Sequence, residues 1–260
     1  MPRFSRLLLS SLVALAALPA AAQDRFEIQV YDSEVARHLE PGLELHLNYA
    51  ASGTRAASGS ELPTNHLLRT TLEPHLGLFG WAEVGGYLQA ALRPEGGYDF
   101  AGVKLRLKLR WPEKLWGWLG LAVNAELSAV PGAYEANRYG SELRFVADLT
   151  AGPLYLAINP ILATDLGGEL AGHPQLQPSA RATLAVAPAL ALGLEYHAGL
   201  GPIDSPLPIR QQSHSVFGVA GLTTGNFDLD LGVGRGLGVA EPWVMRAILG
   251  IHPAPPAGGG

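Results

Sequence analysis

The 260-residue sequence predicts an all-β chain, a single transmembrane up-and-down antiparallel β-barrel of about twelve strands. Three observations predict this class. Apolar and polar residues alternate along most of the chain, as they do in strands, whose successive side chains face opposite sides. Hydrophobic residues make up 48% of the chain, yet no apolar run beyond residue 22 approaches the length of a membrane helix. Long or moderate connections between the strands alternate with short ones. This alternation is typical of barrels with short periplasmic turns and longer outer loops.

The clearest strand is Asp99 to Trp111, which reads DFAGVKLRLKLRW. From residue 103 onward its side chains divide into an apolar set, Val103, Leu105, Leu107, Leu109 and Trp111, and a cationic set, Lys104, Arg106, Lys108 and Arg110. A helix would spread the four cations around its circumference, so the pattern indicates a strand. A soluble sheet would bury the apolar face, whereas a membrane barrel turns it toward lipid and turns the charged face toward a wet lumen.

The ends of the chain have their own composition. Residues 1–22 match a secretory signal peptide, with Arg3 and Arg6 ahead of a short apolar run and with Ala20, Ala21 and Ala22 at the cleavage site. Cleavage after Ala22 leaves 16 basic and 23 acidic residues, a net charge of −7, which argues against a nucleic-acid partner. The chain has no cysteine, so disulfides and thiolate chemistry are excluded.

The rest of the chain divides into three parts. Residues 23–41 are expected to be a periplasmic or plug segment, although the alternation in Asp24 to Asp32 would also suit an extra strand. Residues 42–252 are expected to form the barrel in the outer membrane. Residues 253–260, rich in Pro and Gly, are expected to be a disordered tail.

We expect twelve strands, each near the 9–11 residues that a tilted barrel strand needs. In order they are residues 42–49, 65–76, 81–92, 99–111, 119–127, 141–149, 154–162, 179–187, 190–198, 213–223, 227–233 and 243–251. Pro160 interrupts the seventh, and in the tenth the apolar neighbours Val216 and Phe217 face opposite ways.

Each expected strand alternates apolar outward residues with polar inward ones. The inward polar residues outside the cationic strand are, in order, Glu44, His46, Asn48, Arg69, Thr71, Glu73, His75, Glu83, Gln89, Asn124, Glu126, Glu142, Arg144, Asp148, Asn159, Arg181, Thr183, Glu195, His197, Asp228, Asp230 and Arg246. The tryptophans fall at strand ends, as an aromatic girdle at the membrane interfaces requires. They are Trp81, Trp111, Trp116, Trp118 and Trp243.

Three segments carry a resemblance to a known family. They are Glu27 to Asp32 (EIQVYD), Gly42 to Tyr49 (GLELHLNY) and Phe100 to Lys108 (FAGVKLRLK). Over residues 26–110 the chain resembles bacterial outer-membrane proteins labelled as MetA-pathway of phenol degradation proteins or uncharacterised outer-membrane barrels. That resemblance implies the uptake of small aromatic compounds. The family has no agreed catalytic or binding motif, so no residue role follows from it.

The inward charges are the candidate functional residues. We expect Glu83 to lie opposite Lys108, because the third and fourth strands form a hairpin. Two interpretations stay open: a lattice of neutralised charges that keeps the lumen wet, or an electrostatic track for anions or carboxylate-bearing solutes. The residues predicted to line the lumen are Lys104, Arg106, Lys108, Arg110, Glu83, Glu126, Glu44, His46, Arg69 and Glu73.

The sequence does not predict an enzyme, a cofactor or a metal site. His46, His75 and His197 point inward from different strands, and no pair has metal-ligand spacing. His214 and Ser215 are neighbours on a strand, so they face opposite sides and cannot act together as base and nucleophile. The stretch 231–238, LGVGRGLG, lacks the βαβ context of a phosphate-binding loop.

The expected function is a passive channel or transporter for a small solute, aromatic or anionic, with outer-membrane lipid as the other partner. Two alternatives stay open: an outer-membrane enzyme that acts on lipid, and a non-conducting structural or adhesive barrel. The oligomeric state does not follow from the sequence.

Overall fold

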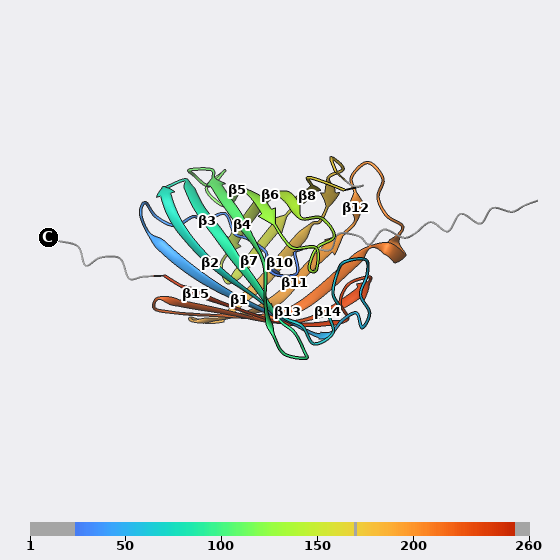
Figure 1. Cartoon of the computed structure of the whole chain (residues 1–260). Helices are drawn as coiled ribbons and strands as arrows, with labels where there is room; N and C mark the ends of the chain where they lie inside the picture. The colour runs from blue at the N-terminus through green and yellow to red at the C-terminus, as the bar shows by residue number, and fades with distance from the viewer. Residues whose placement is uncertain (1–23, 169–170, 253–260) are drawn as a thin grey trace, which may run out of the picture.

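The computed structural model describes residues 24–168 and 171–252, which form a closed antiparallel β-barrel of twelve strands (Figure 1). The elements are β1 (Pro41–Ser52), β2 (Leu68–Phe79), β3 (Ala82–Leu92), β4 (Tyr98–Arg110), β5 (Leu119–Ala129), β6 (Tyr139–Ala151), β7 (Leu154–Asn159), β8 (Ile161–Asp165), β9 (Gln175–Leu176), β10 (Ser179–Ala187), β11 (Leu190–Gly199), β12 (Gly201–Pro202), the 3₁₀ helix η1 (Ile209–Gln211), β13 (Ser213–Thr224), β14 (Phe227–Gly238) and β15 (Trp243–Ile251). The strands form one antiparallel sheet, in which β7 pairs with β6 and β10, β8 with β6 and β9, and β12 with β9, and β1 pairs with β15 to close the ring. The predicted fold class is confirmed. The signal peptide and the C-terminal tail lie outside the described residues.

Three of the twelve barrel strands are built from two short pieces each, namely β7 with β8, β9 with β10, and β11 with β12. Pro160 separates β7 from β8 because proline has no N–H to donate to the ladder. Its carbonyl still accepts a hydrogen bond from the N–H of Phe145 at 2.9 Å, so the barrel stays closed across the break.

The glycine-rich stretch 231–238 belongs to a strand, and β14 runs five residues past the predicted end at Val233. Its alternate glycines face inward, opposite the large inward ring of Phe217 on β13. A Cβ atom at Gly234 would overlap this ring. Glycine therefore leaves space for an aromatic side chain inside the barrel.

The barrel is apolar outside and polar inside. On β4, Leu105 is 68% exposed while its neighbour Lys104 is 7% exposed. The same division recurs around the ring, which is the arrangement of a sheet solvated by lipid on its outer face. Among the described residues, no helix is long and apolar enough to cross a membrane.

The two ends of the barrel differ. One end, here called the turn end, carries the tight turns at residues 80–81, 152–153, 188–189 and 225–226, together with the start of β1 and the end of β15. The connection 111–118 also lies at the turn end, while the other end, the loop end, carries the longest connections, such as 53–67 and 203–212. All five tryptophans are exposed at strand ends, four of them at the turn end and Trp243 at the loop end. Outer-membrane barrels have their short turns on the periplasmic side.

The N-terminal part of the described chain lies inside the barrel. Residues 24–36, here called the luminal segment, form no strand in spite of their alternating pattern. Phe26, Glu27, Ile28 and Tyr31 are buried against the inner wall. A chain surrounded on all sides by a closed sheet finds no free sheet edge to pair with, so its backbone groups must find partners among side chains.

Candidate functional site: the barrel lumen

Side chains of five wall strands hold Phe26 to Tyr31 of the luminal segment by their backbone groups. The carbonyl of Phe26 accepts hydrogen bonds from Asn48 at 2.9 Å and from Thr71 at 3.0 Å. Arg246 donates to the carbonyl of Ile28 at 2.8 Å and Arg144 to that of Gln29 at 3.2 Å. Asn159 makes two hydrogen bonds to Tyr31. Side chains of the wall thus supply the hydrogen-bond partners that the backbone of a strand finds on a neighbouring strand.

Tyr31 is the centre of the packed part of the lumen. Its hydroxyl contacts the hydroxyl of Tyr87 at 2.6 Å and donates to the carboxylate of Glu27. The guanidinium of Arg144 lies 4.2 Å from the centre of its ring, and Lys108 and Arg106 approach the same ring at 5.2 and 5.6 Å. Cations over a desolvated aromatic face stabilise such packing.

All four cations of β4 contact carboxylates. Lys104 binds Asp24 of the luminal segment and Glu126 of the wall, the latter at 3.2 Å. Lys108 binds Asp32 at 3.2 Å, and Arg110 binds Glu34 at 2.5 Å. Three of the four cations therefore pair with the luminal segment, which crosses the lumen within their reach.

The carboxylates that Arg106 contacts in the described part of the chain belong to the wall, namely Glu83 at 2.5 Å and Glu73 at 3.1 Å. Glu83 does lie opposite Lys108 in the register of β3 and β4, as the sequence predicts. Its carboxylate nevertheless accepts hydrogen bonds from Arg106 and from the N–H of Ala36, and Lys108 contacts Asp32 instead.

The ten residues predicted to line the lumen all lie on the inner wall. Eight of them are buried, while Glu44 and Arg110 are half-buried. Glu126 also accepts a hydrogen bond from Asn124 at 2.7 Å. Arg69 lies near the loop end and binds Glu241 of the β14–β15 loop, with one hydrogen bond of 3.0 Å. Glu44, His46 and Glu73 form a group of their own.

A second charge cluster, formed by β10, β11, β14 and β15, is absent from that predicted set. Glu195 accepts hydrogen bonds from Arg246 at 2.6 Å and from Arg181 at 2.7 Å. Asp230 contacts the same two arginines. His197 lies 3.1 Å from Glu195. The sequence signal was present, since all five side chains alternate with apolar residues, but spacing along the chain does not reveal that four strands bring them together.

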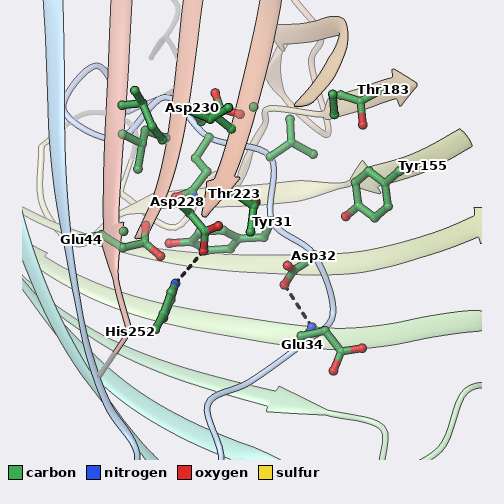
Figure 2. Close-up of a pocket in the computed structure, with 18 of the residues that line it drawn as sticks. Tyr31, Asp32, Glu34, Glu44, Tyr155, Thr183, Thr223, Asp228, Asp230 and His252 are labelled. Atoms are coloured by element: carbon green, nitrogen blue, oxygen red, sulfur yellow. Dashed lines mark hydrogen bonds and ion pairs between the residues drawn. The ribbon is translucent and has the colours of Figure 1, made fainter. Parts of the chain in front are cut away.

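A cavity of about 580 Å³ occupies the turn end of the lumen. Figure 2 shows part of its lining, with Glu44 of β1 and Asp228 and Asp230 of β14 facing the luminal residues Asp32 and Glu34 across the space. Its lining holds seven carboxylates against three permanent cations. The carboxylates are Asp32, Glu34, Glu40, Glu44, Glu83, Asp228 and Asp230, and the cations are Arg106, Lys108 and Arg181. The field in this cavity is therefore negative.

A second cavity, of about 420 Å³, lies at the loop end. Its apolar lining includes Ile28, Leu62, Phe217 and Val244, and at its edge Arg25 binds Glu61 at 3.4 Å. The two cavities share no lining residue in the described part of the chain. Ile28 of the luminal segment and the fully buried pair Glu195 and Arg246 lie between them.

The histidine and serine on β13 do not form a catalytic pair. His214 lies on the outer face, where its Nδ1 is 2.7 Å from the hydroxyl of Tyr196. Ser215 lines the loop-end cavity on the inner face. The strand alternation separates them, as the sequence predicts.

The closed twelve-strand ring, its apolar outer face and its charged lumen define the chain as a β-barrel of the outer-membrane type. No family model matches the sequence, and no curated protein matches it. Among solved structures, the chain is similar to a KdgM porin in complex with disordered oligogalacturonate, at 7% identity and a TM-score of 0.55, over 81% of this chain and 98% of that one. It is also similar to the NanC porin, at 10% identity and a TM-score of 0.53, over 82% and 100%. An outer-membrane channel from Pseudomonas putida F1 aligns at 14% identity and a TM-score of 0.52, over 87% and 100%. At these identities the likeness is one of fold.

Proposed function

We propose that the protein is a passive channel that carries a small solute across the outer membrane. The observation that carries this proposal is the pair of lumen cavities, one at each end of the barrel, separated by the luminal segment and by the pair Glu195 and Arg246. A structural barrel has no need of two cavities in one lumen. The similarity in fold to proteins named as porins and channels supports the proposal.

The distribution of charge favours cationic or neutral solutes over anions. An anion track needs cations free to bind the passing solute, whereas each cation of the β4 row already contacts a carboxylate. The turn-end cavity carries an excess of carboxylates. A negative lining raises the local concentration of cations.

Small aromatic compounds are a second candidate class of solute. The family resemblance implies them, and the apolar lining of the loop-end cavity by Ile28, Leu62 and Phe217 supports them. Such a solute would enter from the loop end and meet the luminal segment as the barrier.

The luminal segment acts in this proposal as a plug. The test is the conductance of the purified mature protein in planar bilayers, compared with a variant that lacks residues 24–36. A variant lacking the loop residues 203–208 serves as the control, because it leaves the lumen lining unchanged. We expect the segment deletion to raise the single-channel conductance severalfold, the loop deletion to leave it unchanged, and the reversal potential in a KCl gradient to show cation preference.

Two results would contradict the proposal. No conductance from either the full chain or the segment deletion, with both folded, would favour the structural or adhesive barrel. An anion preference would reject the argument from charge and restore the anion track.

A further inference from the structure

We infer that Glu44, His46 and Glu73 form a binding site for a divalent transition-metal ion on the lumen wall. Glu44 and His46 are two residues apart on β1 and face the lumen together, and Glu73 on β2 lies directly opposite Glu44 in the strand register. The Nε2 atom of His46 lies 3.0 Å from Glu73 Oε2 and 3.4 Å from Glu44 Oε2. The three ligand atoms all lie within 4.8 Å of one another. Donor atoms bound to one metal at about 2.0–2.2 Å have mutual distances in this range.

Hydrogen bonding alone does not satisfy this group. Nε2 of an imidazole carries at most one hydrogen, but two carboxylate oxygens face it. The Oε2 atom of Glu44 is buried and has no hydrogen-bond partner in residues 24–168 and 171–252. Like charges directly opposite each other on neighbouring strands destabilise the pair. The one hydrogen bond of His46 Nε2 leaves Glu44 Oε2 without a partner, and a metal ion at the centre of the group would bind that oxygen. The ion would also reduce the repulsion between the carboxylates of Glu44 and Glu73.

The charge balance around the group points to a divalent ion. Three carboxylates, those of Glu44, Glu73 and Glu83, surround a single guanidinium, that of Arg106, which contacts Glu83 at 2.5 Å and Glu73 at 3.1 Å. A histidine that ligates a metal ion is neutral, so in the metal-bound state the three carboxylates exceed the guanidinium by two negative charges in a largely buried wall. Uncompensated buried charge is costly, and one M²⁺ ion cancels it.

The donor set indicates which ions fit. One imidazole nitrogen and two carboxylate oxygens suit Zn²⁺, Mn²⁺, Fe²⁺ or Co²⁺, and three protein ligands leave coordination positions open. Arg106 would orient Glu73 by binding its second oxygen, as outer-shell partners of ligating carboxylates do. An ion has a route to the site, because Glu44 is half-buried and lines the carboxylate-rich turn-end cavity (Figure 2).

The experiment is calorimetric titration of the EDTA-treated mature protein in detergent micelles with Zn²⁺ at pH 7. We expect binding of one Zn²⁺ per chain, with affinity weakened at least tenfold in Glu44→Gln and in His46→Gln. The matched control is His252→Gln, which removes a histidine that binds Asp228 at 2.9 Å on the same cavity but lies outside the proposed group. Its affinity should equal that of the unmodified chain. Co²⁺ in place of Zn²⁺ should give visible absorption bands that Glu44→Gln alters.

Several outcomes would overturn the site: no stoichiometric binding, equal affinity in Glu44→Gln, or loss of binding in His252→Gln. If His46→Gln fails to fold, the half-buried Glu44→Gln decides the question on its own. The site does not depend on the channel function. Conductance measured in KCl with EDTA present tests that function separately, so failure of one is distinguishable from failure of the other.

Discussion

Both backbone hydrogen bonds of Tyr31 are made by one side chain, that of Asn159. The Asn159 Oδ1 atom accepts from the Tyr31 N–H at 2.7 Å, and Nδ2 donates to the Tyr31 carbonyl at 3.0 Å. Asn159 is the last residue of β7, next to the break at Pro160. The amide of Asn159 therefore takes the place of a neighbouring strand for the backbone of the buried Tyr31.

Replacing Asn159 with Leu should loosen the luminal segment. Both backbone groups of Tyr31 would then be buried without partners, at a cost of about 1–3 kcal/mol for each group. We expect the amide of Tyr31 to exchange hydrogen at least roughly tenfold faster, since about 1.4 kcal/mol corresponds to tenfold. The measurement is hydrogen exchange with mass spectrometry. Asn137→Leu, which removes an amide bonded to Asp165 at the loop end, should leave this exchange unchanged.

Removing the buried cation of β15 should destabilise the barrel. Arg246→Met removes the more deeply buried of the two guanidiniums that join Glu195 to Asp230, leaves Arg181 as the other, and frees the carbonyl of Ile28. Breaking one side of a buried charge network typically costs about 3–5 kcal/mol. The measurement is the urea midpoint of unfolding in liposomes.

The control for this loss is Arg235→Met on the neighbouring strand. Arg235 is exposed and lies 5.1 Å from the ring of Trp243, so its removal should cost less than about 1 kcal/mol. Equal losses in the two variants would show that burial of the network is not what stabilises this wall.

The alternation of apolar and polar residues was sufficient to predict the barrel, because every barrel strand has one apolar face toward lipid and one polar face toward the lumen. The same argument placed Lys104, Arg106 and Lys108 inside. It could not predict their partners. Lys108 binds Asp32 rather than the Glu83 opposite it, and this choice depends on a segment that shares no register with the wall.

The segment itself shows where periodicity misleads. Asp24 to Asp32 alternates like a strand, yet the ring is closed and offers no edge. Its conformation follows from the wall side chains that bind it, which come from strands far apart in the sequence. The group Glu44, His46 and Glu73 was missed for a related reason, since the third member lies on the adjacent strand.

The loop end should lose stability in acid. Burial raises the pKa of Glu241 in the β14–β15 loop, but the charges of Arg69 and Arg25 and the hydrogen bonds from Arg69 and Thr64 together outweigh it, so the pKa lies below its ordinary value of 4.5. A carboxyl with a depressed folded pKa contributes stability that is complete above the unfolded pKa and is lost as the pH falls through the folded one.

Glu241→Gln measures this contribution. We expect the unmodified chain to exceed the variant in unfolding free energy by about 1.5–3 kcal/mol at pH 7, the range for hydrogen bonds to charged groups. The difference should shrink as the pH falls below 4.5. Urea titrations at a series of pH values provide the test, and a difference that does not vary with pH would contradict it.

The tryptophans should report the position of the lipid. Trp81, Trp116 and Trp243 are exposed at the two ends of the barrel and none lies at mid-height. In liposomes of brominated lipid, we expect bromine atoms near the headgroups to quench the fluorescence more strongly than bromine atoms near the bilayer centre. Stronger quenching by the deep bromines would place the hydrocarbon layer elsewhere on the barrel.

The luminal segment also connects the two strands at which the ring closes. Asn48 of β1 binds the carbonyl of Phe26, and Arg246 of β15 binds that of Ile28 two residues further on. The luminal segment, which belongs to neither strand, therefore links β1 to β15 where the two strands pair. Displacing the segment to let a molecule through would also break these links between β1 and β15. Passage of a solute and the stability of the closed ring therefore depend on the same hydrogen bonds.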